Sequence, residues 1–269
     1  MKNKKIGIIG VGNMGEAILR GLTHKGIAGI VISESRSERR EYIKKTYTVT
    51  VAAGNRELAS HADVIILAVK PQELKGVLRE IAPALAPSTL LISIAAGASL
   101  GAIAAVLGKE ARLVRAMPNI AALMLESATA LAAGGGATAA DIEIAETIFN
   151  ALGRTVVISE VLMDAVTGMS GSGPAYVCLF IEALADGGVR MGLPGKDALA
   201  LAIQTVLGTA RLLAEQGEHP AHLKDRVASP GGTTIAGIAE LEAKGFRGAI
   251  MEAVAAATRR SKELAKISA

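Results

Sequence analysis

The chain has 269 residues, enough for two domains, and 51% of them are hydrophobic, mainly Ala, Leu, Ile and Val. Its formal net charge is +4, but the basic residues are dispersed, and only three Tyr and three Phe are available to stack on bases. This composition argues against a nucleic-acid partner and favours an α/β fold with an additional helical portion.

The sequence indicates a cytoplasmic protein without a membrane partner. Its single cysteine, Cys178, cannot form an internal disulfide, which is typical of proteins in a reducing compartment. The basic N-terminus, Met1–Lys5, is followed by an apolar run of only a few residues, which glycines interrupt from Gly10 onward. We therefore expect neither a signal peptide nor a membrane span.

The first predicted elements are a strand over 6–9, a glycine turn over 10–15 with the spacing GxGxxG, and a helix with apolar residues at helical spacing. Gly10 permits a tight turn, Gly12 lets the backbone approach a pyrophosphate, and Gly15 allows the helix to pack closely on the sheet. This strand, turn and helix predict a dinucleotide-binding fold.

A second strand, over 30–32, ends at the residues that should contact the adenosine ribose, about 20 residues beyond the glycines. Glu34 is placed to accept hydrogen bonds from a ribose diol, which favours NAD. Other side chains nearby fit a 2′-phosphate, which favours NADP. These are Ser35, Arg36, Arg39 and Arg40. We predict NADPH as the preferred hydride donor, with NADH as the alternative.

Further apolar strands are predicted over 63–69, 90–94 and 112–115, as expected for a parallel sheet covered on both faces. The segments that follow them should border the cofactor, because ligands of such sheets lie beyond the carboxyl ends of the strands. These segments are Lys70-Pro71-Gln72, Ala95-Ala96-Gly97 and Ala116-Met117-Pro118-Asn119. Asn55, which opens the helix before the first of these strands, is either a helix cap or a cofactor contact. A strand over 129–133, a helix over 139–152 and a strand over 155–158 complete a dinucleotide-binding domain over 1–159.

A second, all-helical domain is predicted over 160–269, where the strand pattern stops. Its helices are expected over 164–170, 174–191, 196–216, 220–228, 234–243 and 245–265. Apolar residues occupy nearly every side of the second of these helices, and one small domain cannot bury that much surface alone. The predicted fold class is therefore a doubly wound α/β sheet followed by an all-α domain that forms an intertwined dimer.

This combination predicts hydride transfer to or from a small substrate. Dehydrogenases that act on a C–OH bond commonly use a lysine or histidine as the proton acceptor, and none lies between Glu160 and Leu193. His219 and His222 are three apart with a proline between them, which favours an exposed helix start over a metal site, and no metal is predicted. A C=N bond needs no strong enzymatic acid, because it protonates near neutral pH far more readily than a ketone.

The uncharged stretch Ser229-Pro230-Gly231-Gly232-Thr233-Thr234 fits such a substrate. Its glycines and the unpaired N–H groups at the start of the next helix can bind a carboxylate, and a threonine hydroxyl can reach the substrate nitrogen. Taken alone, the same residues also fit an ordinary helix start.

Sequence segments spread over the whole chain resemble pyrroline-5-carboxylate reductases. They are GVGNMG (10–15), LAVKPQ (67–72), RAMPN (115–119), GSGPAY (171–176), EALADGGVRMGLP (182–194) and VASPGGTTIAGIAELE (227–242). The resemblance implies NAD(P)H-dependent reduction of 1-pyrroline-5-carboxylate to L-proline, the last step of proline synthesis. It also implies dimers that interlock through the helical domain and often assemble into larger rings.

Carried onto this chain, the resemblance assigns Thr234 to the imine nitrogen and a short segment to the substrate carboxylate. That segment comprises Ser229, Gly231, Gly232, Thr233 and Thr234. The candidate cofactor residues are Gly10, Gly12, Asn13, Met14, Glu34, Ser35, Arg36, Asn55, Ala68, Val69, Lys70, Pro71, Ala95 and Asn119. The chain departs from the family after Asn119, where Thr-Pro is usual and Ile120-Ala121 stands here.

Two other functions fit parts of the sequence. A hydroxyacid dehydrogenase of the same two-domain type would need a lysine in the first long helix of the second domain, and none lies between Glu160 and Leu193. A non-catalytic dinucleotide sensor is a further alternative, against which the intact SPGGTT segment speaks.

Overall fold

The computed structural model describes residues 4–268, with side chains up to Leu264. Met1–Asn3 of the basic N-terminus and Ala269 of the predicted helical domain lie outside the described residues. The chain forms two compact units, which we call the sheet unit and the helical unit. The sheet unit consists of two stretches of the chain, one ending at Ser172 and one beginning at Ala255. The helical unit comprises Gly173–Val254.

The sheet unit is built on eight strands in the order β3-β2-β1-β4-β5-β6-β7-β8. Neighbouring strands are parallel except for β6 and β7, which are antiparallel. The strands are β1 Ile6–Ile9, β2 Ile30–Ser33, β3 Thr50–Val51, β4 Val64–Leu67, β5 Leu90–Ser93, β6 Arg112–Met117, β7 Ser127–Gly135 and β8 Gly153–Val157. This topology confirms the predicted doubly wound α/β fold.

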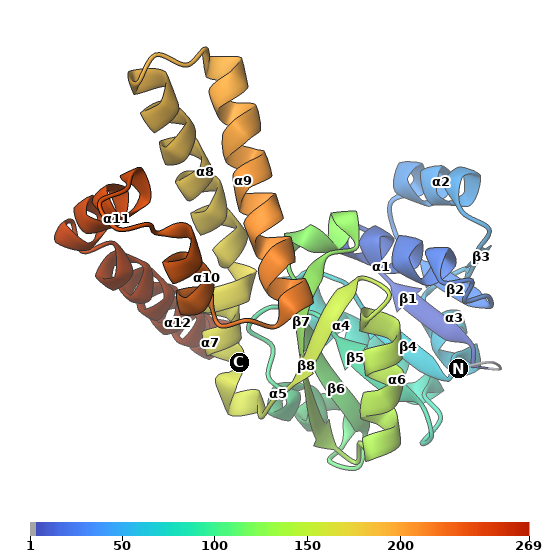
Figure 1. Ribbon diagram of the computed structural model, residues 1–269. Helices are drawn as coiled ribbons and strands as arrows, with labels where there is room; N and C mark the ends of the chain where they lie inside the picture. The colour runs from blue at the N-terminus through green and yellow to red at the C-terminus, as the bar shows by residue number, and fades with distance from the viewer. Residues whose placement is uncertain (1–3, 269) are drawn as a thin grey trace. The chain divides into compact units, whose positions relative to one another are not determined.

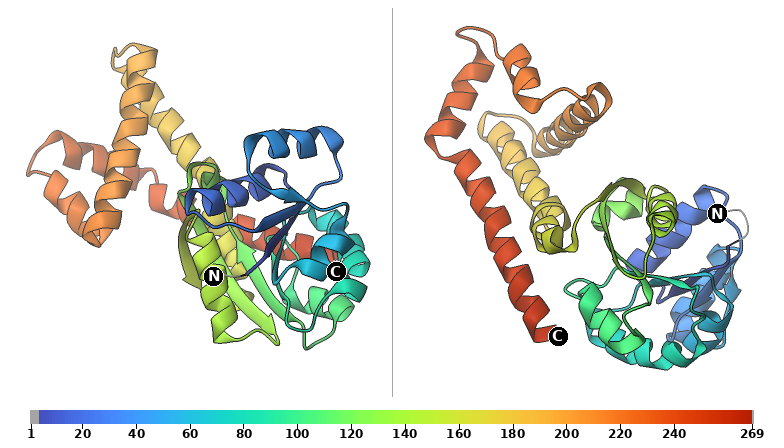
Figure 2. Two further views of the ribbon diagram at one scale, coloured as in Figure 1. Left: turned by 90° about the vertical axis from the view of Figure 1, so that its right-hand side faces the viewer. Right: turned by 90° about the horizontal axis from the view of Figure 1, so that it is seen from below.

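Both faces of the sheet are covered by helices (Figure 2). Ile8 and Ile66 pair across β1 and β4 and pack with α1 (Asn13–His24) and α6 (Ala139–Phe149) on one face. Residues of the opposite pleat, such as Ile65, face the other side. The helices packed there are α3 (Asn55–His61), α4 (Pro71–Ile81) and α5 (Leu100–Leu107). This double burial explains why the strands are apolar throughout.

Two features of the sheet were not predicted from the sequence. β3 was not predicted, because two residues are too short to show a period. β7 runs antiparallel to β6 because only a short connection with the 3-10 helix η2 (Ile120–Met124) joins them, whereas a parallel pair needs a crossover of about a dozen residues or more.

The remaining elements are helical, and within the described residues no strand follows β8. They are η3 (Glu160–Leu162), α7 (Met163–Val166), the π-helical turn η4 (Thr167–Gly171), α8 (Gly173–Arg190), α9 (Gly195–Gln216), α10 (Pro220–Val227), α11 (Thr233–Ala243) and α12 (Phe246–Ser268). The helices predicted over this region are confirmed within a few residues at their ends. α8 and α9 form an antiparallel hairpin, joined at Gly192, which has a φ of +99° (Figure 1).

The helical unit buries little of its apolar surface by itself. Its buried apolar side chains are small apart from Leu223, and its small core joins Ala185, Ala198 and Ala202. Leu179 on α8 is 67% exposed and Leu201 on α9 is 58% exposed. The compact units separate at 172/173. The domain boundary expected at 159/160 stays a prediction.

Candidate active site

The glycine turn connects β1 to α1 at the carboxyl edge of the sheet. Gly10 has a φ of +85°, which disfavours any residue with a side chain, and its N–H donates to the carbonyl oxygen of Ser33 at 2.8 Å. A Cβ at Gly15 would collide with the carbonyl oxygen of Gly10, so the helix packs on the turn as predicted. A Cβ at Gly12 would meet only Arg36 Nη2, 3.8 Å away, and this open backbone leaves room for a phosphate beside the N-terminus of α1.

A pocket of about 790 Å³ lies over this turn and the neighbouring strand ends. Every candidate cofactor residue except Asn119 lines it. The lining comprises Gly10, Gly12, Asn13, Met14, Glu34, Ser35, Arg36, Asn55, Ala68, Val69, Lys70, Pro71 and Ala95, together with Ile9, Ser33, Glu73, Val77, Ile94, Ala96, Met117 and Pro118. The additional residues mostly adjoin predicted strand ends, which is the signal by which they could have been found. The pocket's size and its Gly-rich edge fit a dinucleotide.

Glu34 is the most deeply buried charged group of the pocket. Its carboxylate accepts hydrogen bonds from the backbone N–H groups of Val11 and Arg36 and from the Arg36 guanidinium. Burial alone would raise the pKa of this carboxyl, but the hydrogen bonds from Arg36 and Val11 outweigh it and hold the pKa below its ordinary value of 4.5. Glu34 is therefore ionised at neutral pH.

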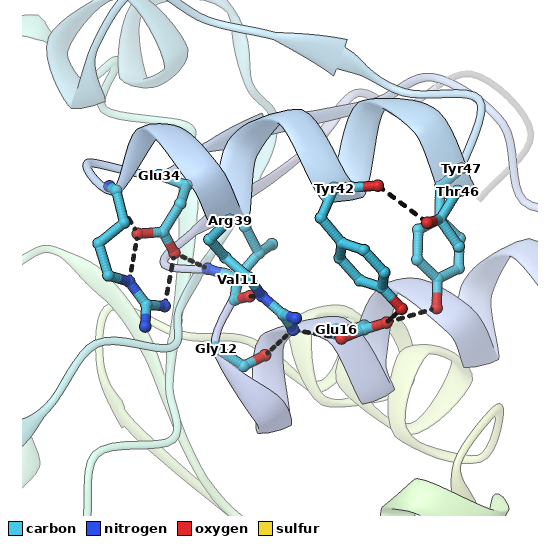
Figure 3. Close-up of polar contacts among 9 residues, drawn as sticks. Val11, Gly12, Glu16, Glu34, Arg39, Tyr42, Thr46 and Tyr47 are labelled. Atoms are coloured by element: carbon cyan, nitrogen blue, oxygen red, sulfur yellow. Dashed lines mark hydrogen bonds and ion pairs between the residues drawn. The ribbon is translucent and has the colours of Figure 1, made fainter.

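Arg39 holds the glycine turn from outside the pocket (Figure 3). It lies on α2 (Ser37–Thr46) and donates to the carbonyl oxygens of Val11 at 2.6 Å and Gly12 at 3.3 Å, and it also pairs with Glu16 of α1. The hydroxyl of Tyr47 donates to Glu16 at 3.0 Å, and burial together with this bond raises the pKa of Tyr47 to about 12. This network was not predicted, because nothing local in the sequence pairs Arg39 with a turn 27 residues away.

The side-chain amides of Asn55 and Asn119 form hydrogen bonds with other groups of the protein. Asn55 is the first residue of α3 and not its cap, which is Gly54, so the capping alternative for Asn55 is wrong. Its amide lines the pocket, accepts from the hydroxyl of Ser33 at 2.7 Å and donates to Glu80 at 2.8 Å. Asn119 lies outside the pocket lining and caps η2, and its amide donates to the carbonyl oxygen of Ser170 at 3.0 Å.

The candidate substrate segment lies in the helical unit and forms a turn that starts α11. Gly231 has a φ of +66°, and the N–H of Gly232 donates to the carbonyl oxygen of Ser229 at 3.0 Å. Gly232 is the N-cap, which leaves the N-terminus without a capping side chain. The first bond of the helix runs from Ala236 N to the carbonyl oxygen of Gly232. The N–H groups of Thr233 and Thr234 therefore have no acceptor within the helix.

Within the described residues, no group of three or more His, Cys, Asp and Glu side chains is arranged to hold a metal ion. The rings of His219 and His222 lie 6.2 Å apart. His219 caps α10, where its Nδ1 accepts a hydrogen bond from the N–H of Ala221 at 3.2 Å. This contact fits the helix start that was expected for the two histidines.

Comparison with known proteins assigns both parts of the chain. A family model described as pyrroline-5-carboxylate reductase dimerisation matches residues 160–264, and one described as NADP oxidoreductase, coenzyme F420-dependent, matches residues 5–97. The sequence is 53% identical over 265 residues to a pyrroline-5-carboxylate reductase of Synechocystis, with 97% of this chain and 98% of that protein covered.

Solved structures agree with these matches. A pyrroline-5-carboxylate reductase of Coxiella burnetii superimposes with a TM-score of 0.94 at 36% identity, covering 97% of this chain and 98% of that one. The enzyme of Plasmodium falciparum, solved with NADP bound, gives a TM-score of 0.85 at 35% identity, covering 98% of this chain and 99% of that one. With these identities over nearly its full length, the chain belongs to the pyrroline-5-carboxylate reductase family.

Proposed function

We propose that the chain reduces 1-pyrroline-5-carboxylate to L-proline with a reduced nicotinamide cofactor, NADPH in preference to NADH. The observation that carries the proposal is the uncharged turn at the start of α11, in a chain whose other unit holds a dinucleotide-sized pocket. A substrate with one carboxylate and one C=N group requires little more than N–H donors, one hydroxyl and a hydride source.

The carboxylate is held by the N-terminus of α11. The N–H groups of Thr233 and Thr234 and the hydroxyl of Ser229 bind it, supported by the positive end of the helix dipole, while Gly232 lines the turn and donates its own N–H to Ser229. Gly231 allows the turn that presents these groups, because its φ of +66° favours a residue without a side chain. No charged side chain is needed, which agrees with the composition of this segment.

Thr234 acts at the reacting C=N bond. Its side chain is half-buried, and its hydroxyl forms a hydrogen bond with the substrate nitrogen. The substrate enters as the iminium ion, so hydride addition to the carbon of C=N⁺ yields the neutral amine without further protonation. The bound reduced nicotinamide supplies that hydride. Thr234 thus orients the substrate and need not transfer a proton.

The cofactor pocket favours NADPH through Ser35 and Arg36, which lie at its adenosine end, directly after β2. The candidate cofactor residues that line the pocket contact the dinucleotide along its length, and Asn119 contacts its nicotinamide end. An NADP-bound structure of the Plasmodium falciparum relative supports the same preference.

The helical unit joins two copies of the chain, and the dimers assemble further into a ring. Its exposed apolar side chains and the match to a dimerisation model support this. By length and composition alone α9 could cross a membrane, but a partner subunit accounts for its exposed apolar side chains equally well. We place the protein in the cytoplasm, without a membrane or nucleic-acid partner.

The test is an initial-rate measurement with 1-pyrroline-5-carboxylate and each cofactor in turn. We expect oxidation of both NADPH and NADH, with the larger kcat/KM for NADPH. A folded, assembled protein that oxidises neither cofactor would contradict the proposal.

Replacing Thr234 tests its role in the same assay. Thr234→Ala should lower kcat/KM by roughly 10- to 1,000-fold, the range for losing one hydrogen bond at the reacting group. Thr234→Ser keeps the hydroxyl and should stay near wild type. Thr147→Ala is the control, since Thr147 is exposed and its hydroxyl donates to the carbonyl oxygen of Glu143 in its own helix. An unchanged rate for Thr234→Ala removes Thr234 from the mechanism.

A further inference from the structure

Glu34 occupies the position that usually marks an NAD-binding sheet. It directly follows β2 and lines the pocket, where an acidic residue normally accepts hydrogen bonds from the ribose hydroxyls of NAD. Its side chain is only 4% exposed and accepts hydrogen bonds from Val11 and Arg36. A ribose diol can bind Glu34 only if its carboxylate oxygens can accept further hydrogen bonds.

The carboxylate is saturated. Oε1 accepts from the backbone N–H and from Nε of Arg36, both at 3.0 Å. Oε2 accepts from Val11 N at 3.0 Å and from Nη2 of Arg36 at 3.2 Å. A carboxylate has about four acceptor sites, and these four bonds fill them. A ribose diol could bind only by displacing Arg36 or by leaving the Val11 N–H without a partner, and an unpaired buried donor is costly.

Arg36 is the group that Glu34 holds in place. The pair uses two of the five guanidinium N–H groups, and within residues 4–268 the other three have no protein partner. The Arg36 side chain is 64% exposed and lies over the open backbone of Gly12. A fixed, planar guanidinium with free donors is the side chain best suited to a phosphate.

The two other arginines nearby are engaged elsewhere. Arg39 donates to the carbonyl oxygens of Val11 and Gly12 and pairs with Glu16. Arg40 donates through Nη1 to the carbonyl oxygen of Glu34. Neither lines the pocket, so Arg36 is the arginine that faces a ligand there.

We propose that Glu34 determines cofactor specificity by anchoring Arg36 for the 2′-phosphate of NADPH, and that it does not accept the ribose diol of NADH. The inference rests on the proposed function for the identity of the two cofactors. Because the charges of Glu34 and Arg36 cancel within the pair, the pair as a whole does not repel the phosphate, and the free N–H groups of Arg36 remain available to it. The acidic residue that ordinarily indicates NAD thus favours NADPH here.

The experiment compares the binding of NADPH and NADH to the full-length protein and its Glu34→Gln variant, by nicotinamide fluorescence and without a pyrroline substrate. Glutamine cannot hold Arg36 through two charged hydrogen bonds, so we expect the Kd for NADPH to rise about 10-fold and that for NADH to stay within about 2-fold. Glu38→Gln is the matched control, with the same charge change at an exposed residue of α2, and should alter neither Kd.

Arg36→Gln tests the other half of the pair. It should weaken NADPH binding at least as much as Glu34→Gln, and the double variant should be no weaker than Arg36→Gln alone, because the two residues act as one unit. In the assay with substrate, both variants should lower kcat/KM more for NADPH than for NADH, so that the preference for NADPH is lost.

Several results would overturn the inference. Tighter NADPH binding with weaker NADH binding in Glu34→Gln would make Glu34 a diol acceptor that repels phosphate. An equal loss of affinity for both cofactors would mean that Glu34 only supports the glycine turn through Val11. Unchanged Kd values for both cofactors would leave Glu34 without a role in binding. Since binding needs no turnover, a protein that binds NADPH selectively but does not reduce the pyrroline refutes the proposed function alone. Wild-type protein that binds neither cofactor refutes both.

Discussion

The two units of this chain differ in where they place their aliphatic side chains. In the sheet unit, every strand residue of β1, β4 and β5 is buried under helices of the same unit. In the helical unit, large apolar residues such as Leu179 and Leu201 are exposed, and small alanines form the core. These three strands of the sheet unit are thus covered within one copy of the chain. The helical unit requires a second apolar surface to cover it.

This contrast explains how one aliphatic composition serves two purposes. Apolar residues in short runs between glycine turns form strands that neighbouring helices cover. Similar residues spread around a long helix, such as α9, cannot all face one neighbour. The stability of the sheet unit should therefore be independent of protein concentration, whereas that of the helical unit should depend on assembly.

The strongest test of the contrast disrupts the apolar cover of the helical unit. Leu201→Asp places a charge on the exposed face of α9, and in a symmetric dimer the change occurs twice. We expect the dimer dissociation constant to rise at least about 100-fold, measured by analytical ultracentrifugation over a range of concentrations. Leu201→Met preserves the apolar area and should assemble normally. An Asp variant with the assembled mass of the wild type at low concentration would show that this face has no partner.

A smaller effect is expected from the buried charge of the sheet unit. Asp141 is fully buried and pairs with Arg112, and it also accepts from the N–H and hydroxyl of Thr138 at the start of α6. Burial raises the pKa of Asp141, but these partners lower it further, so that it lies below its ordinary value of 3.8. Asp141→Asn should lower the free energy of unfolding by roughly 2 to 3 kcal/mol at neutral pH, measured by urea denaturation.

The pH dependence of this loss follows from the direction of the pKa shift. A depressed folded-state pKa stabilises the fold above the unfolded value of 3.8, and this contribution disappears as pH falls through the folded pKa. The difference between wild type and Asp141→Asn should be constant above about pH 5 and shrink below about pH 4. A difference that grows on acidification would contradict the assignment. The free energies of unfolding of wild type and Asp141→Asn should not change with protein concentration, in contrast to the assembly of the Leu201 variants.

The smallest effect concerns the contact between α2 and the glycine turn. Arg39→Gln removes the guanidinium from the carbonyl oxygens of Val11 and Gly12. We expect the Kd for NADPH and for NADH to rise equally, by about 5- to 10-fold, because the turn approaches the pyrophosphate common to both. This separates Arg39 from Glu34, whose replacement should affect NADPH alone. Tyr42→Phe, which loses only an exposed bond to Glu16, is the control. Unchanged binding by Arg39→Gln would show that the turn holds its shape unaided.

Much of the fold could be predicted from local patterns, because a glycine turn between an apolar run and a helical period has few other solutions. The glycine turn, the end of the second strand and the strand ends around Lys70 and Ala95 together identified most of the pocket lining. The engagement of Glu34 could not be predicted, since its donor Val11 N lies 23 residues away and meets it only in the folded sheet. Asn119 shows the same limit, because its partner Ser170 lies 51 residues further along the chain.

The helix α12 begins in the helical unit and ends in the sheet unit, where Ser261 Oγ donates to Asp164 at 2.7 Å. The sheet unit is thus assembled from two separate stretches of the chain, and the helical unit lies between them in the sequence. Recombination between family members would need two crossovers, near codons 172 and 255, to exchange the helical unit cleanly. A single crossover near codon 172 would also replace the end of α12. Asp164 would then come from one parent and Ser261 from the other, so the contact would depend on both parental sequences.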